Sequence, residues 1–319
     1  MQNGLEKLNE LTWSYRAART LHVLTGLKVF TLLDREPQTA DALAASCDVQ
    51  RDLLEKLLIA GVAMELLKKE GDKYCNAPLS AEFLVEGKPM YQGNIIAHAS
   101  IVWDVWSELP QTVGLTQPED TETPQAHENF ILGMHNITMA GRGRIFLDAI
   151  DLSGKASLLD VGGGPGTYSI LACRRYPELR CTVFDLPETI AVARRTIAEH
   201  NLTDRIAVRQ GSWDSDDFGQ SYDAALMSNI LHGPDSQAAM KLGKAFAALQ
   251  PGGMLIVQEF LLTDDKTGPL VPALFNIMVG AYSRPELIAE IERAGFTDVR
   301  LVAHCGTIGS AWLTAVKPT

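Results

Sequence analysis

The stretch LLDVGGGPG, residues 158–166, decides the fold of this 319-residue chain. A short apolar run leads into a turn dense in glycine, and the helical pattern of residues 166–175 follows at once. Glycine lets a backbone adopt positive φ values and approach a ligand closely. The stretch therefore predicts a buried strand, a ligand-binding turn and a helix, a unit that several kinds of nucleotide cofactor use.

Strand and helix patterns alternate after this stretch. Alternation of this kind, with apolar strands, indicates a parallel, doubly wound α/β sheet. We therefore expect residues 113–319 to form a Rossmann-like domain, in which residues 113–154 are linker helices on the substrate side. Strands are predicted at 156–161, 180–184, 206–210, 222–227, 254–260, 299–303 and 311–316, and helices at 187–200, 236–249 and 284–294.

Residues 1–112 have mainly helical patterns instead. Residues 22–33 space their apolar side chains as one buried helical stripe, Thr39 is a predicted N-cap, and residues 51–63 form a further apolar helix. Two short runs flank Glu70-Gly71-Asp72, which has the composition of a hairpin turn. Three helices closed by a two-stranded wing predict a winged-helix module.

Composition and charge narrow the class of function. The chain has 28 basic and 39 acidic residues, and its net charge of −11 disfavours a long phosphate-binding surface. No apolar run is long enough to span a bilayer, and the N-terminus lacks the pattern of a secretory signal. Five widely spaced cysteines without a CxxC pair predict neither a zinc site nor a disulfide framework. We expect a cytoplasmic enzyme that acts on a small molecule, without metal, membrane or nucleic-acid partners.

Polar or aromatic side chains follow three successive predicted strands and indicate the cofactor. Asp160 ends the first strand, where a carboxylate would repel a pyrophosphate but attract the ammonium group of a methionine moiety. Asp185 ends the second, where an acid accepts hydrogen bonds from ribose hydroxyls. Trp213 follows the third, where its ring can flank an adenine. Because Thr167 also replaces the third glycine of a dinucleotide-binding turn, the pattern favours S-adenosylmethionine.

Each of these three residues also has a structural alternative. Asp160 would cap a turn, Asp185 would cap the following helix, and Trp213 would belong to the core. Open α/β sheets bind ligands at the carboxyl ends of their strands. The placement of all three residues at successive strand ends therefore favours a cofactor site.

Several motifs together resemble one family. They are DVGGGPG (160–166), FDLP (184–187), LHGPDSQ (231–237), LQPGGMLIVQEF (249–260) and a terminal AGF (294–296). They resemble the S-adenosylmethionine-dependent O-methyltransferases that include plant caffeate and hydroxyindole enzymes and bacterial polyketide-tailoring enzymes. The resemblance covers nearly the whole chain and implies a homodimer with a winged-helix-like dimerisation domain, a small-molecule acceptor and S-adenosylhomocysteine as product. The cofactor residues that we assign are Asp160, Gly162, Gly164, Asp185, Leu186, Ser212, Trp213 and Ser228.

Methyl transfer from a sulfonium is an in-line displacement, so the enzyme must mainly align the acceptor and remove its proton. His232 follows the fourth strand and matches the family's general-base histidine by position. Glu259, at the end of the next strand, matches the acid that orients this histidine. Without the resemblance, a lone loop histidine is more often a surface residue.

The resemblance also places one helix over the substrate pocket. Phe130, Met134, His135 and Met139 lie on this predicted helix, and we add Asn229 to the acceptor side. A core stripe is the alternative for Phe130 and Met139, and His135 is an alternative base.

The sequence departs from the family at several positions. His232-Gly233-Pro234 replaces the HDW of plant members, Ser212 stands where many members carry an adenine-binding aspartate, and Ser228 replaces a plant lysine. S- or C-methylation, and a non-methylating S-adenosylmethionine enzyme, therefore stay as alternatives to O-methylation. A winged-helix DNA-binding regulator is a further alternative, which the two basic residues within 51–63 disfavour.

Overall fold

The computed structural model describes residues 2–115, 123–305 and 310–319, and the chain divides into two compact units. One unit is Met1–Glu119 with Leu262–Ala281, and the other is Asp120–Leu261 with Tyr282–Thr319. The segment Leu262–Ala281 was not predicted to belong with the N-terminal helices. Its helix α14 (Leu270–Val279) packs on α4 (Arg51–Ala63).

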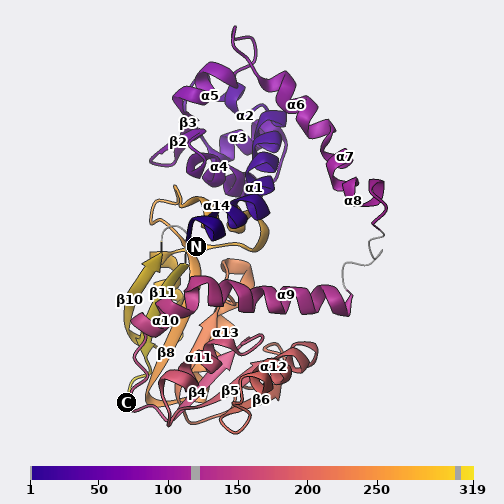
Figure 1. Cartoon of the computed structure of the whole chain (residues 1–319). Coiled ribbons are helices and arrows are strands. Elements are labelled where there is room, and N and C mark those ends of the chain that lie inside the picture. The colour runs from indigo at the N-terminus through magenta and orange to yellow at the C-terminus, as the bar shows by residue number, and fades with distance from the viewer. Residues whose placement is uncertain (1, 116–122, 306–309) are drawn as a thin grey trace. The chain divides into compact units, whose positions relative to one another are not determined.

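The N-terminal unit combines helices with a small sheet (Figure 1). The stripe predicted over residues 22–33 is divided between two helices, because Lys28 adopts a left-handed φ of 56° between them. Thr39 is an N-cap as predicted, since its hydroxyl accepts a hydrogen bond from the Ala42 amide. The predicted hairpin is present, and a short additional strand, β1, pairs with β3. The remaining elements are α1 (Gln2–Gly26), α2 (Val29–Leu32), β1 (Gln38–Thr39), α3 (Ala40–Cys47), β2 (Leu67–Glu70), β3 (Lys73–Asn76), α5 (Pro78–Phe83), α6 (Gly93–Ile101), α7 (Trp103–Ser107) and α8 (Leu109–Thr112).

The second unit contains an eight-stranded sheet in the order β10-β11-β8-β7-β4-β5-β6, with β9 paired to β8. Strands β4 to β8 pair in parallel, as the sequence predicts. Strands β10 and β11 are antiparallel to their neighbours. Four residues separate β10 from β11, whereas a parallel crossover needs about a dozen. The parallel arrangement therefore does not extend to this edge.

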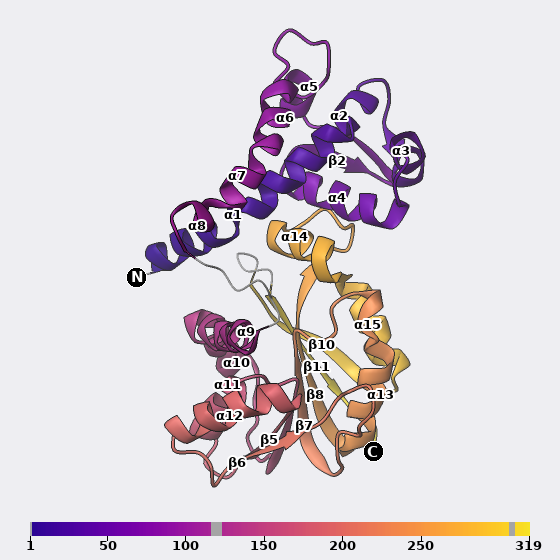
Figure 2. The same ribbon diagram turned by 90° about the vertical axis from the view of Figure 1, so that its right-hand side faces the viewer.

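Helices cover both faces of this sheet: α11 and α12 lie on one side, and α13 and α15 on the other (Figure 2). Side chains of β4 alternate between the two faces, so Leu158 joins one buried apolar cluster and Leu159 and Val161 join another. The elements are α9 (Pro124–Ile137), a π-helical turn (Thr138–Arg142), α10 (Gly143–Ala149), β4 (Ser157–Val161), α11 (Thr167–Arg175), β5 (Arg180–Asp185), α12 (Pro187–Glu199), β6 (Ile206–Gln210), β7 (Tyr222–Ser228), a 3₁₀ turn (Pro234–Ser236), α13 (Ala238–Ala248), β8 (Leu249–Leu262), β9 (Tyr282–Ser283), α15 (Arg284–Arg293), β10 (Thr297–Cys305) and β11 (Ser310–Val316).

The order of the strands locates a binding site. Strand β4 lies between β5 and β7, so the winding of the chain reverses on either side of it. Open α/β sheets bind ligands at this reversal, outside the carboxyl ends of the strands. The end of β4 is where the glycine-rich turn begins.

Candidate active site

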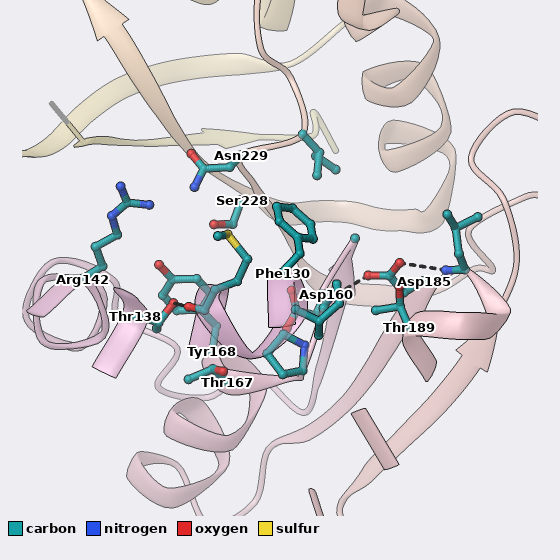
Figure 3. Close-up of a pocket in the computed structure, with 18 of the residues that line it drawn as sticks. Phe130, Thr138, Arg142, Asp160, Thr167, Tyr168, Asp185, Thr189, Ser228 and Asn229 are labelled. Carbon is teal, nitrogen blue, oxygen red and sulfur yellow. Dashed lines mark hydrogen bonds between the residues drawn. The ribbon is translucent and has the colours of Figure 1, made fainter. Parts of the chain in front are cut away.

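A cavity of about 310 Å³ lies at the carboxyl ends of β4, β5 and β7 (Figure 3). Most of the predicted site residues line it. On the cofactor side these are Asp160, Gly162, Gly164, Asp185, Leu186, Trp213 and Ser228, and on the acceptor side they are Phe130, Met134, Asn229 and His232. Four other predicted residues, Ser212, His135, Met139 and Glu259, are not among the residues that line it.

Asp160 is a buried carboxylate with one free oxygen. The side chain is 1% exposed, and the Ser169 hydroxyl donates to its Oδ2 at 2.7 Å. Its Oδ1 has no hydrogen-bond partner in the described residues. Burial, above all, raises the pKa of Asp160 to about 6. A cationic ligand would compensate the cost of burying this charge, so the residue fits an ammonium group.

Asp185 is held by the backbone on both sides. The Gly164 amide donates to its Oδ2 at 2.8 Å and the Leu186 amide donates to its Oδ1 at 2.7 Å. Burial raises the pKa of this carboxyl, and the two amides oppose that shift. Because each carboxylate oxygen can accept more than one hydrogen bond, Asp185 retains the capacity to bind hydroxyl groups.

The glycine-rich turn needs glycine for two different reasons. Gly162 and Gly164 both have positive φ values, of 63° and 55°. A Cβ at Gly162 would also lie 2.8 Å from Cγ2 of Ile230, whereas a Cβ at Gly164 would meet nothing within 4 Å. The open space at Gly164 leaves room for a ligand against the backbone.

Trp213 forms one wall of the cavity and also packs against the core, so its two predicted roles are compatible. The Lys241 ammonium lies 4.2 Å from the centre of the Trp213 ring and donates to the Ile230 carbonyl at 2.8 Å. Ser212 belongs to a turn: its hydroxyl accepts from the Asp214 amide at 3.2 Å.

His232 and Glu259 are brought together as the sequence predicts. Glu259 Oε2 lies 3.3 Å from His232 Nδ1, and its Oε1 accepts from the Leu231 amide at 2.7 Å. Glu259 is 1% exposed, and its Oε2 makes no hydrogen bond with the described residues, so it is the Leu231 amide that fixes this buried carboxylate beside the histidine. Asn229 adopts a φ of 53°, and its buried Oδ1 has no hydrogen-bond partner in the described part of the chain.

Of the four residues predicted to face the substrate pocket from this helix, Phe130 and Met134 line the cavity, whereas His135 and Met139 do not. Phe130 is 61% exposed and Met139 is 53% exposed, so the alternative of a core stripe is wrong for both. Met139 lies beyond α9, in the π-helical turn. His135 faces the neighbouring helices, because its Nδ1 lies 2.9 Å from Thr167 Oγ1 and its ring lies 6.2 Å from that of His200.

Arg142 lines the cavity and was not predicted. It is 5% exposed, its guanidinium lies 4.9 Å from the Phe260 ring, and its Nε has no hydrogen-bond partner among the residues described. Burial lowers its pKa. Figure 3 shows Arg142 and Asp185 on opposite sides of the pocket. The pattern MAGRGRIF of residues 139–146 does not distinguish this arginine from Arg144, because only the π-helical turn directs Arg142 inward.

The sheet and its cavity define an α/β protein with a ligand site at the carboxyl ends of its strands, and comparisons identify the family. A model described as the O-methyltransferase domain matches residues 104–294, and one described as the O-methyltransferase dimerisation domain matches residues 9–86. A 3-hydroxy-5-methyl-1-naphthoate 3-O-methyltransferase from Streptomyces sahachiroi is 31% identical, with 88% of this chain and 85% of the relative covered. The chain therefore belongs to the O-methyltransferase family and is an S-adenosylmethionine-dependent methyltransferase.

Two further comparisons extend this result. An N,N-dimethyltransferase from Streptomyces rimosus is also 31% identical, with 98% of this chain and 96% of the relative covered. An O-methyltransferase family 2 protein from Planctomyces limnophilus, solved in complex with apigenin, has the same fold: its TM-score is 0.84 at 24% identity, with 98% of this chain and 96% of that chain covered. The predicted family and fold class are confirmed.

Over residues 2–115, 123–305 and 310–319, no helix combines the length and the apolar character that a membrane span requires. Within the same ranges, no three His, Cys, Asp or Glu side chains lie close enough together to hold a metal ion.

Proposed function

We propose that this enzyme transfers the methyl group of S-adenosylmethionine to a hydroxyl of a small-molecule acceptor, without a metal, and releases S-adenosylhomocysteine. One observation carries the proposal. The carboxylates at the ends of β4 and β5 line the same cavity as His232, whose Nδ1 lies 3.3 Å from Glu259 Oε2.

The charges of the cavity fit this cofactor. Asp160 would bind the ammonium group through its free Oδ1, and Arg142 would bind the carboxylate of the same methionine moiety. Asp185 would accept the ribose hydroxyls, and Trp213 would flank the adenine. Gly162, Gly164, Leu186 and Ser228 would complete the cofactor site, with Ser212 just outside it. When bound, the sulfonium supplies a methyl group that is already activated for displacement.

His232 would remove the proton of the acceptor hydroxyl. Glu259 at Nδ1 favours the tautomer that carries its proton on that nitrogen, which leaves Nε2 free to act as the base. The Leu231 amide on the other oxygen of Glu259 holds the carboxylate in place. We prefer His232 to His135 as the base, because His232 lines the cavity and His135 does not.

The acceptor would lie against α9. Phe130 and Met134 offer it apolar surface, and Asn229 offers an unpaired oxygen that can accept a hydrogen bond. Of the two relatives at 31% identity, one is a naphthoate O-methyltransferase, which supports a small-molecule acceptor, and the other is an N,N-dimethyltransferase. N-methylation of an amine is therefore the second candidate function.

The test is turnover with matched acceptors. Aromatic compounds that carry either a hydroxyl or an amine at the same position would be incubated with S-adenosylmethionine, and both products quantified by mass spectrometry. We expect S-adenosylhomocysteine and a methyl ether in equal amounts. Methylation of the amines alone would replace the proposal with the second candidate, and cofactor consumption without any methylated product would reject both.

We also propose that the enzyme is a homodimer. The dimerisation model matches residues 9–86, and helices α6 and α7 of the same unit expose Ile101, Val105 and Trp106. Ile101 and Trp106 are 75% and 70% exposed, which is unusual for large apolar side chains unless a partner covers them. Light scattering should give twice the mass of one chain, and Trp106→Glu should lower that mass.

A further inference from the structure

Two histidines join helix α9 to the cofactor side of the cavity. His127 Nε2 lies 3.1 Å from Thr189 Oγ1, and His135 Nδ1 lies 2.9 Å from Thr167 Oγ1. The two histidines are about 12 Å apart along the helix, and Met134, which lines the cavity, lies between them. The two hydrogen bonds differ because Thr189 lies beside the Asp185 carboxylate (Figure 3).

Thr189 connects His127 to the carboxylate that is proposed to bind the ribose. It is 1% exposed and lies beside Asp185 (Figure 3), and although burial raises the pKa of that carboxyl, the Thr189 side chain opposes the rise. A threonine hydroxyl has one proton, and an ionised carboxylate only accepts. In the tautomer that carries its proton on Nε2, His127 donates to the Thr189 oxygen, which leaves the Thr189 proton to be directed at the neighbouring Asp185 carboxylate.

We propose that His127 is a positioning residue for the cofactor, because it orients the Asp185 carboxylate through Thr189. This role rests on the proposed function, in which Asp185 accepts the ribose hydroxyls. Hydrogen bonds in a chain polarise one another, so the His127 donor strengthens the bond from Thr189 to the carboxylate. The same chain links the ribose position to α9, which contributes Phe130 and Met134 to the cavity.

A neighbouring contact provides a control for the alternative that His127 only holds α9 against α12. Glu128 of α9 forms an ion pair with Arg195 of α12, the helix that also carries Thr189. Glu128 does not line the cavity. Its ion pair is partly exposed, and such pairs contribute little to stability. Glu128→Gln therefore removes the ion pair between the same two helices and leaves His127, Thr189 and Asp185 unchanged.

The experiment compares two ligands by calorimetry: S-adenosylhomocysteine and an analogue that lacks both ribose hydroxyls. In His127→Leu, we expect binding of S-adenosylhomocysteine to weaken about fivefold, as for the loss of one hydrogen bond, and binding of the analogue to stay nearly unchanged. His127→Gln retains an N–H donor and should therefore restore much of the affinity for S-adenosylhomocysteine that His127→Leu loses. Thr189→Val should resemble His127→Leu, and the double variant should show no further loss, because both changes break one chain.

Three results would overturn the role of His127. They are equal weakening of both ligands in His127→Leu, unchanged binding of S-adenosylhomocysteine in His127→Leu and Thr189→Val, or the same loss of discrimination in Glu128→Gln. Asp185→Asn tests the underlying assignment separately. If Asp185→Asn keeps the full preference for the ribose hydroxyls, the proposed ribose site is wrong. If it loses that preference while His127→Leu keeps it, only the chain through Thr189 is wrong.

Discussion

The two walls of the cavity are built differently. The cofactor wall, which is the turn of residues 160–166 together with Asp185, is held by its own backbone: the Gly164 and Leu186 amides both donate to Asp185. The acceptor wall consists of α9 and the loop of residues 229–232. It contains the unpaired Oδ1 of Asn229 and the exposed ring of Phe130.

This difference explains how each wall would recognise its own ligand, the cofactor or the acceptor. The cofactor wall uses groups that lie a few residues from a strand end, so its geometry exists before a ligand arrives. The acceptor wall uses side chains from separate elements, with polar groups that a ligand must satisfy. A shared cofactor and divergent acceptors fit this arrangement, and relatives at the same 31% identity act on oxygen and on nitrogen.

The largest expected effect is on the acceptor wall. His232→Ala should lower kcat by about 10²- to 10⁴-fold, the usual contribution of a general base, and leave the Kd of S-adenosylhomocysteine unchanged. Steady-state kinetics and calorimetry would measure the two quantities. His304→Ala, on the exposed surface of β10, is the control. Normal turnover of His232→Ala would show that no proton has to leave through this residue.

Asp160→Asn should act on the cofactor wall alone. Loss of a buried charge pair predicts about 100-fold weaker binding of S-adenosylmethionine, which calorimetry would measure. Equal affinity in variant and wild type would remove Asp160 from the cofactor site.

The same variant should change how stability depends on pH. Burial raises the pKa of Asp160 from 3.8 to about 6 in the folded protein. The stability that this group contributes is therefore fully present below about pH 4 and is lost as the pH rises through about 6. The difference corresponds to up to about 3 kcal/mol. Urea unfolding of the free enzyme between pH 4 and 8 should show this decrease in the wild type, and Asp160→Asn should lack it. An identical pH profile in both proteins would contradict the assignment.

The smallest effects are expected in the glycine-rich turn of the cofactor wall, where Gly162 lies against Ile230 of the acceptor wall. Gly164→Ala should cost about 1 kcal/mol of stability, because its φ is positive, and should weaken cofactor binding without changing kcat. Gly162→Ala should cost more and should lower kcat as well, since its Cβ would displace Ile230 in the loop that carries His232. Urea unfolding and steady-state kinetics would compare them. If Gly162→Ala and Gly164→Ala have equal effects on kcat, a displacement of Ile230 by the turn does not alter the position of His232.

Much of the cofactor wall was predictable because its causes are local. A strand that ends in glycines places Asp160 and the turn together, and a parallel neighbour places Asp185 beside them. The pairing of His232 with Glu259 was also predictable, since β7 and β8 are adjacent parallel strands that end at the same edge. What these side chains do in the reaction stays a prediction.

The rest could not be predicted from sequence spacing. Arg142 lies in the cavity because a π-helical turn redirects it, and His127 reaches Thr189 because α9 packs on α12. The grouping of Leu262–Ala281 with the N-terminal helices depends on packing between distant segments.

The sequence by itself therefore determined the family, the α/β fold and the cofactor wall of this methyltransferase, because strand ends and glycine conformations are local properties of the chain. Only the tertiary structure decided which faces of α9 meet the cavity and which polar groups remain unpaired there. The physical reason is that the position of a helix on a sheet depends on packing with residues far away in the sequence, and no spacing rule encodes that packing.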